Sequence, residues 1–329
     1  MLFFKPQKLE FNKINKMEFR KLESIDKPVS KIVFGCAGDA FATGNNADSL
    51  LDAAFEAGFN TFDTAEVYGL SEKTLGKWIA KRHLRDEVVI ITKGCHPHGG
   101  PRVDAVSLRH DIEQSLKRLK TDYIDIYMLH RDHPDCNIEE ILSVLNEYIQ
   151  KGKIIKIGVS NWTHERIELA NRVAKEKGFV EFSSSSPNLS LARQVNDPWG
   201  GNCVSISGDK KAFEWYKQNK DIPVFAYSCL GRGLFSGKVK SDDVEGTRKY
   251  LDKYAIKGYL SDDNIERLAK AEKIATEKGC TVAQLSLAWL LQQEFDVYPI
   301  VSISKPERIE DNVKAIDIKL TKEEIEMLS

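Results

Sequence analysis

Side chains suited to proton transfer follow three short apolar runs of the chain. Asp63 and Tyr68 come after the run GFNTF, Lys93 ends the run VVIITK, and His130 ends the run YIDIYMLH. In a barrel of alternating strands and helices, the carboxyl ends of the strands open on one face, where side chains from successive strands converge. We therefore expect a carboxylate, a phenol, an ammonium and an imidazole to meet in one site.

These four residue types suit the protonation of an oxygen that gains negative charge. A tyrosine titrates at about pH 10, and a neighbouring ammonium, here Lys93, stabilises its ionised form. A buried ammonium needs a carboxylate partner, for which Asp63 is the candidate. Taken singly, the four could be a helix cap, a packed aromatic ring, a solvated charge and an interior histidine. Their occurrence at successive strand ends favours the proton-transfer interpretation.

The composition narrows the class of protein. A net charge of −1 over 329 residues gives no reason to expect a nucleic acid or an anionic membrane as partner. No apolar run reaches the roughly 18 residues that span a bilayer, and the N-terminus lacks a secretory signal. The six cysteines form no CxxC pair, which fits a reduced compartment and no structural zinc. We expect a cytoplasmic protein, with residues 1–16 as an N-terminal extension.

From residue 17 onward, strand-like and helix-like segments alternate. The stretch 17–35 is typical of a β-hairpin that leads into a first strand. The predicted strands are 31–35, 59–62, 88–92, 124–129, 153–160, 179–184, 222–228 and 297–303. The predicted helices are 47–58, 71–82, 104–119, 138–150, 164–176, 209–219, 261–278, 281–293 and 306–315. Two long loops, 188–208 and 229–260, interrupt the alternation, and loops of that length are often functional.

Eight strand–helix units predict a parallel sheet with crossover helices. No GxGxxG follows the first strand, which argues against a dinucleotide-binding open sheet. No linker rich in Pro, Gly or Ser divides the chain. We therefore expect an α/β fold in which residues 17–329 form a single (β/α)8 TIM-type barrel with an N-terminal β-hairpin.

Six motifs occur in order: DTAEVYG, ITKG, YMLH, KIGVSN, AYSCLGRGLFSGK and SKPERIEDN. With them the chain resembles the aldo-keto reductases from about Met17 onward. The resemblance implies a barrel enzyme that reduces an aldehyde or ketone to an alcohol with NAD(P)H. It makes Tyr68 the general acid and Lys93 the group that lowers its pKa. Asp63 would pair with Lys93, and His130 would orient the substrate.

The resemblance also implies a nicotinamide site. Ser160 and Asn161 would hold the nicotinamide amide, and Tyr227 would stack on its ring. Ser184 stands where the family has a glutamine. The alternatives are that Ser160 or Asn161 caps the helix predicted to follow them, and that Tyr227 is a core aromatic.

The rest of the cofactor would lie along two segments. The resemblance places Ser228, Leu230, Gly231, Arg232 and Gly233 at the pyrophosphate, where backbone N–H groups would bind it and the glycines would allow close approach. At the adenosine end it places Ser302, Ser304, Lys305, Arg308, Asp311 and Asn312.

Arg308 favours NADP(H) over NAD(H), because its position matches the family's clamp on the 2′-phosphate and a planar guanidinium suits that anion. Ser302 stands where many members carry a lysine, and Lys305 is the candidate to supply that charge. The alternative for Arg308 is a surface ion pair with Glu324 or a helix neighbour.

The substrate pocket should be walled by loops that carry His96 and Trp199, with 97, 98, 132 and 133 as further candidates. The segments HPH and HRDH suggest metal ligands, but histidines in a Pro/Gly loop are weak evidence and we expect no metal. The partner would be a small carbonyl compound. The alternatives are an NADPH-sensing regulatory or binding subunit on the same barrel, and an unrelated barrel hydrolase or lyase that binds no nucleotide.

Overall fold

Eight parallel strands close into a barrel at the centre of the computed structural model, which describes residues 17–45 and 47–329. Around the barrel the strand order is β10-β3-β4-β5-β6-β7-β8-β9. The strands are β3 (Val33–Gly35), β4 (Thr61–Asp63), β5 (Val89–Gly94), β6 (Ile124–Leu129), β7 (Ile154–Ser160), β8 (Ser185–Ser186), β9 (Val224–Ala226) and β10 (Val297–Val301). The predicted (β/α)8 architecture is confirmed. The predicted extension 1–16 lies outside the described residues.

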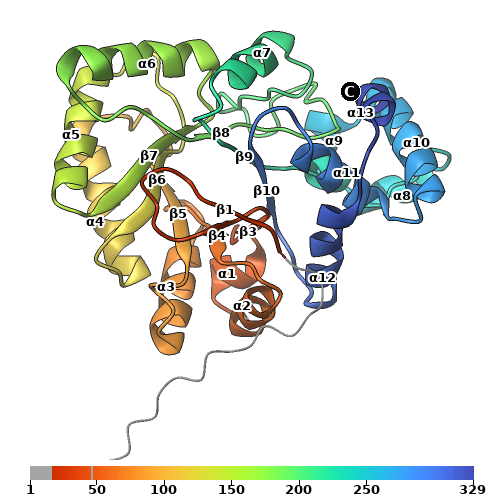
Figure 1. Ribbon diagram of the computed structural model, residues 1–329, viewed down its shortest axis with the longest axis horizontal. Helices are drawn as coiled ribbons and strands as arrows, with labels where there is room; N and C mark the ends of the chain where they lie inside the picture. Colours follow the sequence, from red (N-terminus) through yellow and green to blue (C-terminus); the bar gives the residue numbers. More distant parts are fainter. Residues whose placement is uncertain (1–16, 46) are drawn as a thin grey trace, which may run out of the picture.

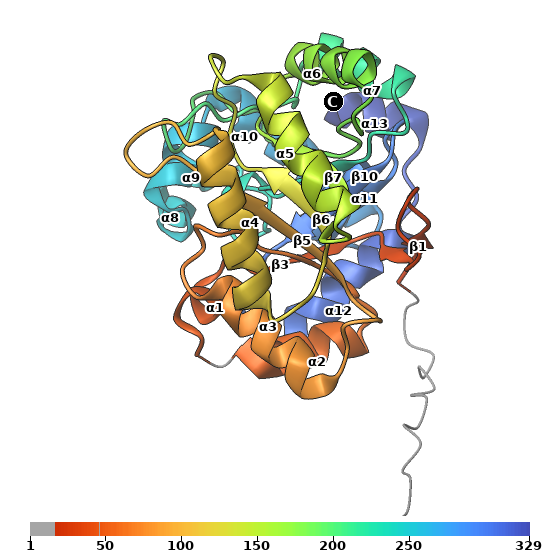
Figure 2. The same ribbon diagram turned by 90° about the vertical axis from the view of Figure 1, so that its left-hand side faces the viewer.

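Helices surround the barrel (Figure 1). Figure 2 shows α3, α4 and α5 together on one side of the molecule. The α-helices are α1 (Asp39–Thr43), α2 (Ala47–Glu56), α3 (Ser71–Arg82), α4 (Ala105–Leu119), α5 (Ile138–Gln150), α6 (His164–Lys177), α7 (Lys210–Gln218), α8 (Val244–Thr247), α9 (Lys253–Tyr259), α10 (Asp262–Glu277), α11 (Val282–Leu291), α12 (Glu307–Val313) and α13 (Lys322–Leu328). The 3-10 helices are η1 (Gly231–Gly233), η2 (Arg248–Tyr250) and η3 (Lys314–Asp317). Thus the predicted loop 229–260 contains two short α-helices and two 3-10 turns.

The predicted hairpin closes one end of the barrel. Strands β1 (Phe19–Arg20) and β2 (Val29–Ser30) pair antiparallel. Leu22, Ile25 and Val29 are buried and pack with the side chains that fill the barrel, among them Val89 and Ile126. Since this end is filled with apolar side chains, a polar site is left to the opposite end, where the strands terminate.

The sixth barrel strand lies later in the chain than the sequence predicts. The predicted strand 179–184 is a connecting segment, and the strand is Ser185–Ser186. The reason is the side chain of Asn171 on α6, which donates to the Phe182 carbonyl and accepts from the Phe182 amide, both at 2.9 Å. Because these backbone groups are already paired, Phe182 packs beside α6 against Trp162 and does not join the barrel wall.

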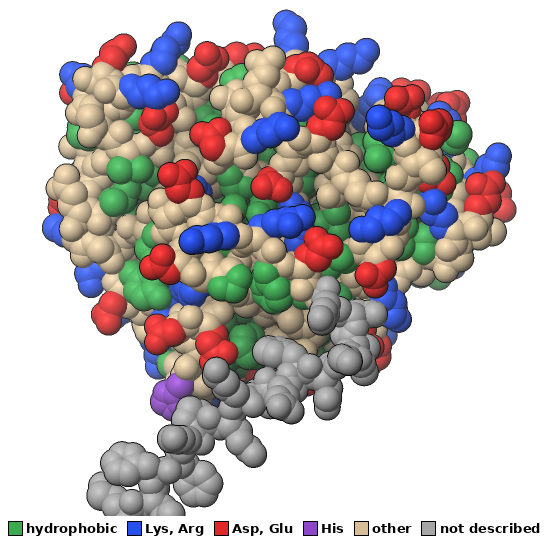
Figure 3. Space-filling model, in the orientation of Figure 1, with side chains coloured by type: hydrophobic (Ala, Val, Ile, Leu, Met, Phe, Trp, Pro, Cys, Tyr) green, Lys and Arg blue, Asp and Glu red, His purple; other side chains and the backbone are tan. Residues whose placement is uncertain are grey.

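On the face shown in Figure 3, basic and acidic side chains alternate without a large area of one sign. This agrees with the near-zero net charge of the sequence. In the described ranges, no helix combines the length and apolar character needed to cross a bilayer.

Candidate active site

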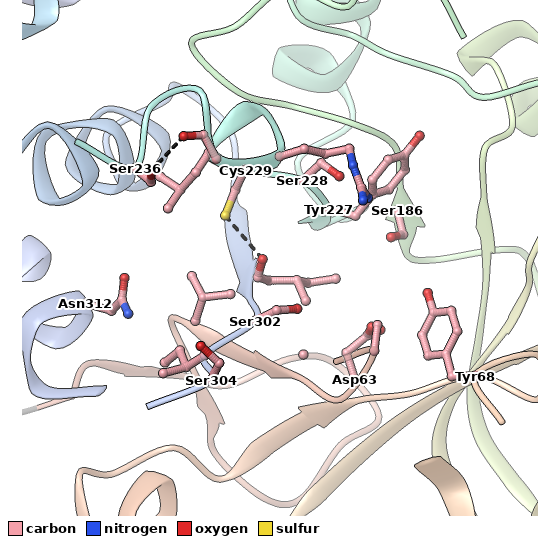
Figure 4. A pocket seen from close by; sticks show the side chains of 18 of the residues that line it. Asp63, Tyr68, Ser186, Tyr227, Ser228, Cys229, Ser236, Ser302, Ser304 and Asn312 are labelled. Atoms are coloured by element: carbon pink, nitrogen blue, oxygen red, sulfur yellow. Dashed lines mark hydrogen bonds between the residues drawn. The ribbon is translucent and has the colours of Figure 1, made fainter. Parts of the chain in front are cut away.

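A cavity of about 850 Å³ lies at the carboxyl ends of the barrel strands. Figure 4 shows Asp63 and Tyr68 toward one end of it and Ser304 and Asn312 toward the other. We call the first the tetrad end, defined by Asp63, Tyr68, Lys93 and His130. We call the second the α12 end, defined by Ser304, Arg308, Asp311 and Asn312. All eight residues line the cavity.

The structure brings Asp63 and Lys93 into a buried ion pair. Lys93 Nζ donates to Asp63 Oδ2 at 2.5 Å and to the Thr64 carbonyl at 3.1 Å. The side chains of Lys93 and Asp63 are only 4% and 5% exposed. Burial lowers the pKa of Lys93, but the charge of Asp63 and the neighbouring phenol outweigh it, so the net pKa is raised. The ammonium therefore stays charged at neutral pH.

Tyr68 lies beside this pair, in the turn between β4 and α3. Lys93 Nζ is 5.5 Å from the centre of the Tyr68 ring, and the Tyr68 and His130 rings meet edge to face at 5.6 Å. Burial raises the pKa of Tyr68, while the Lys93 ammonium acts in the opposite, predicted direction. The net direction is upward, which differs from the predicted lowering because loss of solvent outweighs the nearby charge. Tyr68 is therefore a protonated phenol at neutral pH.

His130 is a neutral imidazole in this setting. It is 6% exposed, and its backbone amide donates to the Gly94 carbonyl at 2.8 Å, which fixes it next to β5. Burial, together with the charges of Lys93, His96 and Arg131, holds the pKa of His130 well below its usual value. Its Nδ1 atom is buried and has no hydrogen-bond partner among the described residues.

Ser160 and Asn161 take part in a network below the cavity. Ser160 Oγ donates to the Ser186 carbonyl at 2.9 Å. The Asn161 amide donates to the His130 carbonyl and accepts from the Tyr227 hydroxyl at 2.7 Å. Ser160, Asn161 and Tyr227, which were expected at the nicotinamide, line the cavity. Ser186 also lines it and was not predicted.

The helix-cap interpretation of Ser160 and Asn161 is wrong. Helix α6 is capped by Thr163, whose side chain accepts from the Arg166 amide. Asn161 instead adopts a left-handed backbone conformation, with φ 60°, and its side-chain oxygen also accepts from the Val204 amide at 3.1 Å. Asn161 thus joins β7 to the loop that precedes α7.

Ser186, and not Ser184, reaches the cavity. Ser184 is buried in the barrel wall, where its hydroxyl donates to the Ile157 carbonyl at 3.3 Å, and it is absent from the cavity lining. The shift of two residues follows from the displaced strand β8. Ser186 Oγ donates to the Phe225 carbonyl at 2.8 Å, which holds it at the junction of β8 and β9.

The segment after β9 is a tight turn. The Gly231 amide donates to the Ser228 carbonyl and the Gly233 amide to the Leu230 carbonyl, so these two amides serve the turn and not a ligand. Gly231 has φ 55°, and a Cβ there would lie 2.6 Å from Ala192 Cβ, so only glycine fits. Ser228, Leu230, Arg232 and Gly233 line the cavity, whereas Gly231 does not.

At the α12 end, Ser302 and the four defining residues line the cavity, but Lys305 does not. The cation that lines it instead is Lys238, in the turn segment after η1. Arg308 is exposed and makes no ion pair within the described chain; Glu324, its proposed partner, pairs with Lys278 at 2.9 Å. The predicted surface ion pair is therefore wrong. The signal for Lys238 was present in the motif GLFSGK.

Further lining residues come from positions that the motifs did not single out. Arg131 follows His130 directly, and Thr281, Ala283 and Gln284 come from the start of α11. The others are Gly35, Ala37, Val67, Ser186, Cys229, Ser236, Tyr250, Ile300, Val301 and Ile303. Of the loop residues predicted to wall the substrate pocket, His96 and Trp199 line the cavity.

Trp199 packs where the two long loops meet. The guanidinium of Arg232 lies 5.0 Å from the Trp199 ring and 5.4 Å from the Tyr254 ring. Arg232 also forms an ion pair with Asp252 at 2.5 Å. Trp199 is 39% exposed and contacts Tyr227. The ring therefore both packs its loop onto the neighbouring loop and faces the cavity.

The cysteines are unbonded, and Cys229 is the one whose side chain lies along the cavity in the described chain. Burial raises the pKa of Cys229 to about 12, so it is a neutral thiol. Among residues 17–45 and 47–329, no three His, Cys, Asp or Glu side chains are grouped in a way that could hold a metal ion.

The profile described as the aldo/keto reductase family matches residues 31–329. The chain belongs to this family. It is 32% identical over 287 residues to a Schizosaccharomyces pombe protein provisionally named a voltage-gated potassium channel subunit beta, covering 83% of this chain and 80% of that protein. It is 31% identical over 310 residues to the aldo-keto reductase yakc of the same yeast, whose name carries NADP(+), covering 89% and 85%.

Solved structures agree with the family. A crystal structure of the thermostable aldo-keto reductase Tm1743 with the inhibitor epalrestat matches with a TM-score of 0.72 and 26% identity, covering 95% of this chain and 98% of that one. The chain is thus a member of a family of oxidoreductases that act on small carbonyl compounds.

Proposed function

We propose that this aldo/keto reductase reduces an aldehyde or ketone to an alcohol with NADPH, and that Tyr68 protonates the carbonyl oxygen. The observation that carries the proposal is the buried Lys93–Asp63 pair beside Tyr68 and His130 in one cavity. Such a set has a proton to give and a fixed positive charge next to the group that gives it.

Each member of the tetrad has a distinct task in the proposal. Tyr68 holds its proton at neutral pH and gives it to the oxygen as negative charge develops there. Lys93 stabilises the tyrosinate that is left, because a nearby ammonium favours an anion. Asp63 keeps the ammonium in place and charged. His130, as a neutral imidazole, orients the carbonyl oxygen beside Tyr68.

The cavity suits a nicotinamide dinucleotide. It runs from the tetrad to α12, and at its far end Lys238 and Arg308 are exposed cations that make no ion pair within the described chain. These would hold the phosphates, with Arg308 as the candidate for the 2′-phosphate. Ser160, Asn161 and Tyr227 would hold the nicotinamide. When bound, the reduced cofactor supplies the hydride that the carbonyl carbon accepts.

Purified protein should consume NADPH in the presence of a panel of aldehydes and ketones. In Tyr68→Phe the proton donor is lost and the ring is kept, so turnover should fall by about 10²- to 10⁴-fold. NADPH affinity, followed by quenching of tryptophan fluorescence, should stay near that of the native chain. Near-normal turnover by Tyr68→Phe would rule out Tyr68 as the general acid.

A second candidate function is an NADPH-sensing subunit with little turnover. It is favoured by the 32% identity to the protein provisionally named a potassium channel subunit beta. This candidate predicts tight NADPH binding, negligible turnover over the whole carbonyl panel, and a stable partner in pull-down experiments. Turnover by the native chain that depends on Tyr68 would decide for the reductase.

A further inference from the structure

Arg131 is a buried cation at the tetrad end of the cavity. It follows His130 directly after β6, is 8% exposed, and lines the cavity. Removing a guanidinium from water is costly, so buried arginines are normally paired with a carboxylate. The partner of this guanidinium therefore matters for what the cavity can bind.

The described residues give Arg131 only a weak partner. Its Nη1 donates to Cys203 Sγ at 3.0 Å, and its Nε is buried with no hydrogen-bond partner within the described residues. Burial raises the pKa of Cys203 to about 11, so that thiol is neutral and supplies no negative charge. The charge of Arg131 is thus uncompensated by this contact.

Nearby carboxylates are occupied by other groups. Asp132 pairs with Arg166 at 3.2 Å. The Asp197 carboxylate accepts from backbone amides of its own loop, including that of Cys203. Glu66 contacts His98, and Asp63 holds Lys93. In the described chain, Arg131 makes no ion pair.

The other cations of the cavity differ from Arg131. Lys93 and Arg232 are each paired with an aspartate, while Lys238 and Arg308 are exposed to solvent and border the α12 end. Arg131 alone among these five is both buried and without an ion-pair partner in the described residues. Its charge acts on His96, and its contact with Cys203 connects it to the loop that carries Trp199.

We propose that Arg131 binds an anionic group of the substrate, a carboxylate or a phosphate monoester carried on the same molecule as the carbonyl. A planar guanidinium recognises both groups through paired hydrogen bonds. The inference rests on the proposed carbonyl reduction and adds to it a substrate class: oxo acids or phosphorylated aldehydes and ketones. Arg131 is then a specificity-determining residue.

A purely electrostatic role is the competing explanation, since the Arg131 charge also helps to keep His130 neutral. The two roles predict different effects on one ratio, kcat/KM for an anionic substrate divided by kcat/KM for its neutral counterpart. An electrostatic role alters turnover of charged and neutral substrates alike. A binding role changes the preference between them, whatever the variant does to the absolute rate.

The experiment compares kcat/KM for matched substrates: an oxo acid against its primary amide, and a phosphorylated hydroxyaldehyde against its unphosphorylated form. The native chain should prefer at least one anionic member by about tenfold to a hundredfold, the range expected for hydrogen bonds to a charged group. Arg131→Gln should reduce that ratio to about one, and Arg131→Lys should retain part of it. The pair that shows the preference identifies the anion.

Two controls keep the result interpretable. Arg166→Gln removes a neighbouring arginine that does not line the cavity, and it should leave the ratio unchanged. Calorimetric titration with the hydroxy acid and hydroxy amide products, which measures binding without turnover, should show the same preference. Should Arg131→Gln fail to fold, Arg131→Lys and the native chain still give the comparison.

The proposal is overturned if the native chain shows no preference for either anionic member in turnover or in binding. It is also overturned if the preference survives in Arg131→Gln. Absence of turnover for every substrate, with product binding still selective for the anion, would instead contradict the proposed reduction and leave the role of Arg131 standing.

Discussion

The two ends of the cavity hold their charges in opposite ways. At the tetrad end, Lys93 and Asp63 are almost fully buried and paired with each other. At the α12 end, Arg308 is exposed and makes no ion pair in the described chain. Lys238, farther along the cavity wall, is also exposed and has no ion-pair partner among the described residues. The Lys93–Asp63 pair of the proton-transfer site is therefore complete within the protein, while the cations at the α12 end are free for whatever binds.

This difference follows from what each end has to do. A group that moves a proton must have its environment fixed before the reaction, because reorganising water around it costs energy. A group that captures a phosphate gains from being reachable, since exposed cations attract anions from solution. The contrast can be tested by variants that affect one end and not the other.

Breaking the buried pair should have the largest effect. Lys93→Met leaves the Asp63 carboxylate buried without a partner and should lower the free energy of unfolding by about 3–5 kcal/mol. Turnover should also fall by orders of magnitude. The double variant Asp63→Leu/Lys93→Met removes both charges and should recover most of the stability but none of the turnover. Urea unfolding measures the free energy of unfolding of each variant. If the loss of stability in the double variant equalled the sum of the losses in the two single variants, the pair would not be coupled.

At the exposed end the expected effect is smaller. Arg308→Gln should raise the Kd for NADPH by about tenfold, the value of one solvated charge-assisted contact, and should leave the Kd for NADH nearly unchanged. Lys305→Gln is the matched control, because Lys305 lies outside the cavity lining. Fluorescence titration with both nucleotides gives the answer. Equal weakening of NADPH by both variants would mean that only general charge matters there.

The smallest expected effect is the contribution of the buried His130 imidazole to the pH dependence of stability. The folded-state pKa of His130 lies well below 6.5, so below pH 6.5 the unfolded chain binds a proton that the folded chain does not. Stability is therefore lost as pH falls, by about 1 kcal/mol for each pH unit below 6.5 until the folded pKa is reached. His130→Asn should lack this part of the pH dependence. Unfolding curves that fall equally with pH in both proteins would show that His130 does not titrate this way.

The sequence allowed a good prediction of the barrel and of the tetrad end. The tetrad residues lie in short motifs at strand ends, and parallel strands place such ends on one face without help from distant contacts. Only the net direction of the Tyr68 pKa differed from the prediction, because burial outweighs the charge of Lys93. The extent of burial around a phenol depends on how the loops pack. A motif cannot report that extent.

Other parts of the site depend on contacts between distant segments. Ser184 was predicted in place of Ser186 because strand β8 begins later than expected. The side chain of Asn171, eleven positions before Phe182, hydrogen-bonds the Phe182 backbone, so the strand starts only at Ser185. Lys238 lies within the motif AYSCLGRGLFSGK, but the motif alone does not show that it reaches the cavity, because the path of its loop is set by the turn after β9. Neither the Asn171 contact nor this loop path leaves a periodic pattern in the sequence.

The most direct test measures both ends in one experiment. NADPH affinity and turnover at saturating NADPH would be determined for the native chain, Tyr68→Phe and Arg308→Gln with one reactive carbonyl substrate. We expect Tyr68→Phe to lose turnover and keep affinity, and Arg308→Gln to lose affinity and keep most of its saturated turnover. If either variant lost both properties together, or if the native chain bound no NADPH, the division of the cavity into a proton-transfer end and a phosphate-binding end would be contradicted.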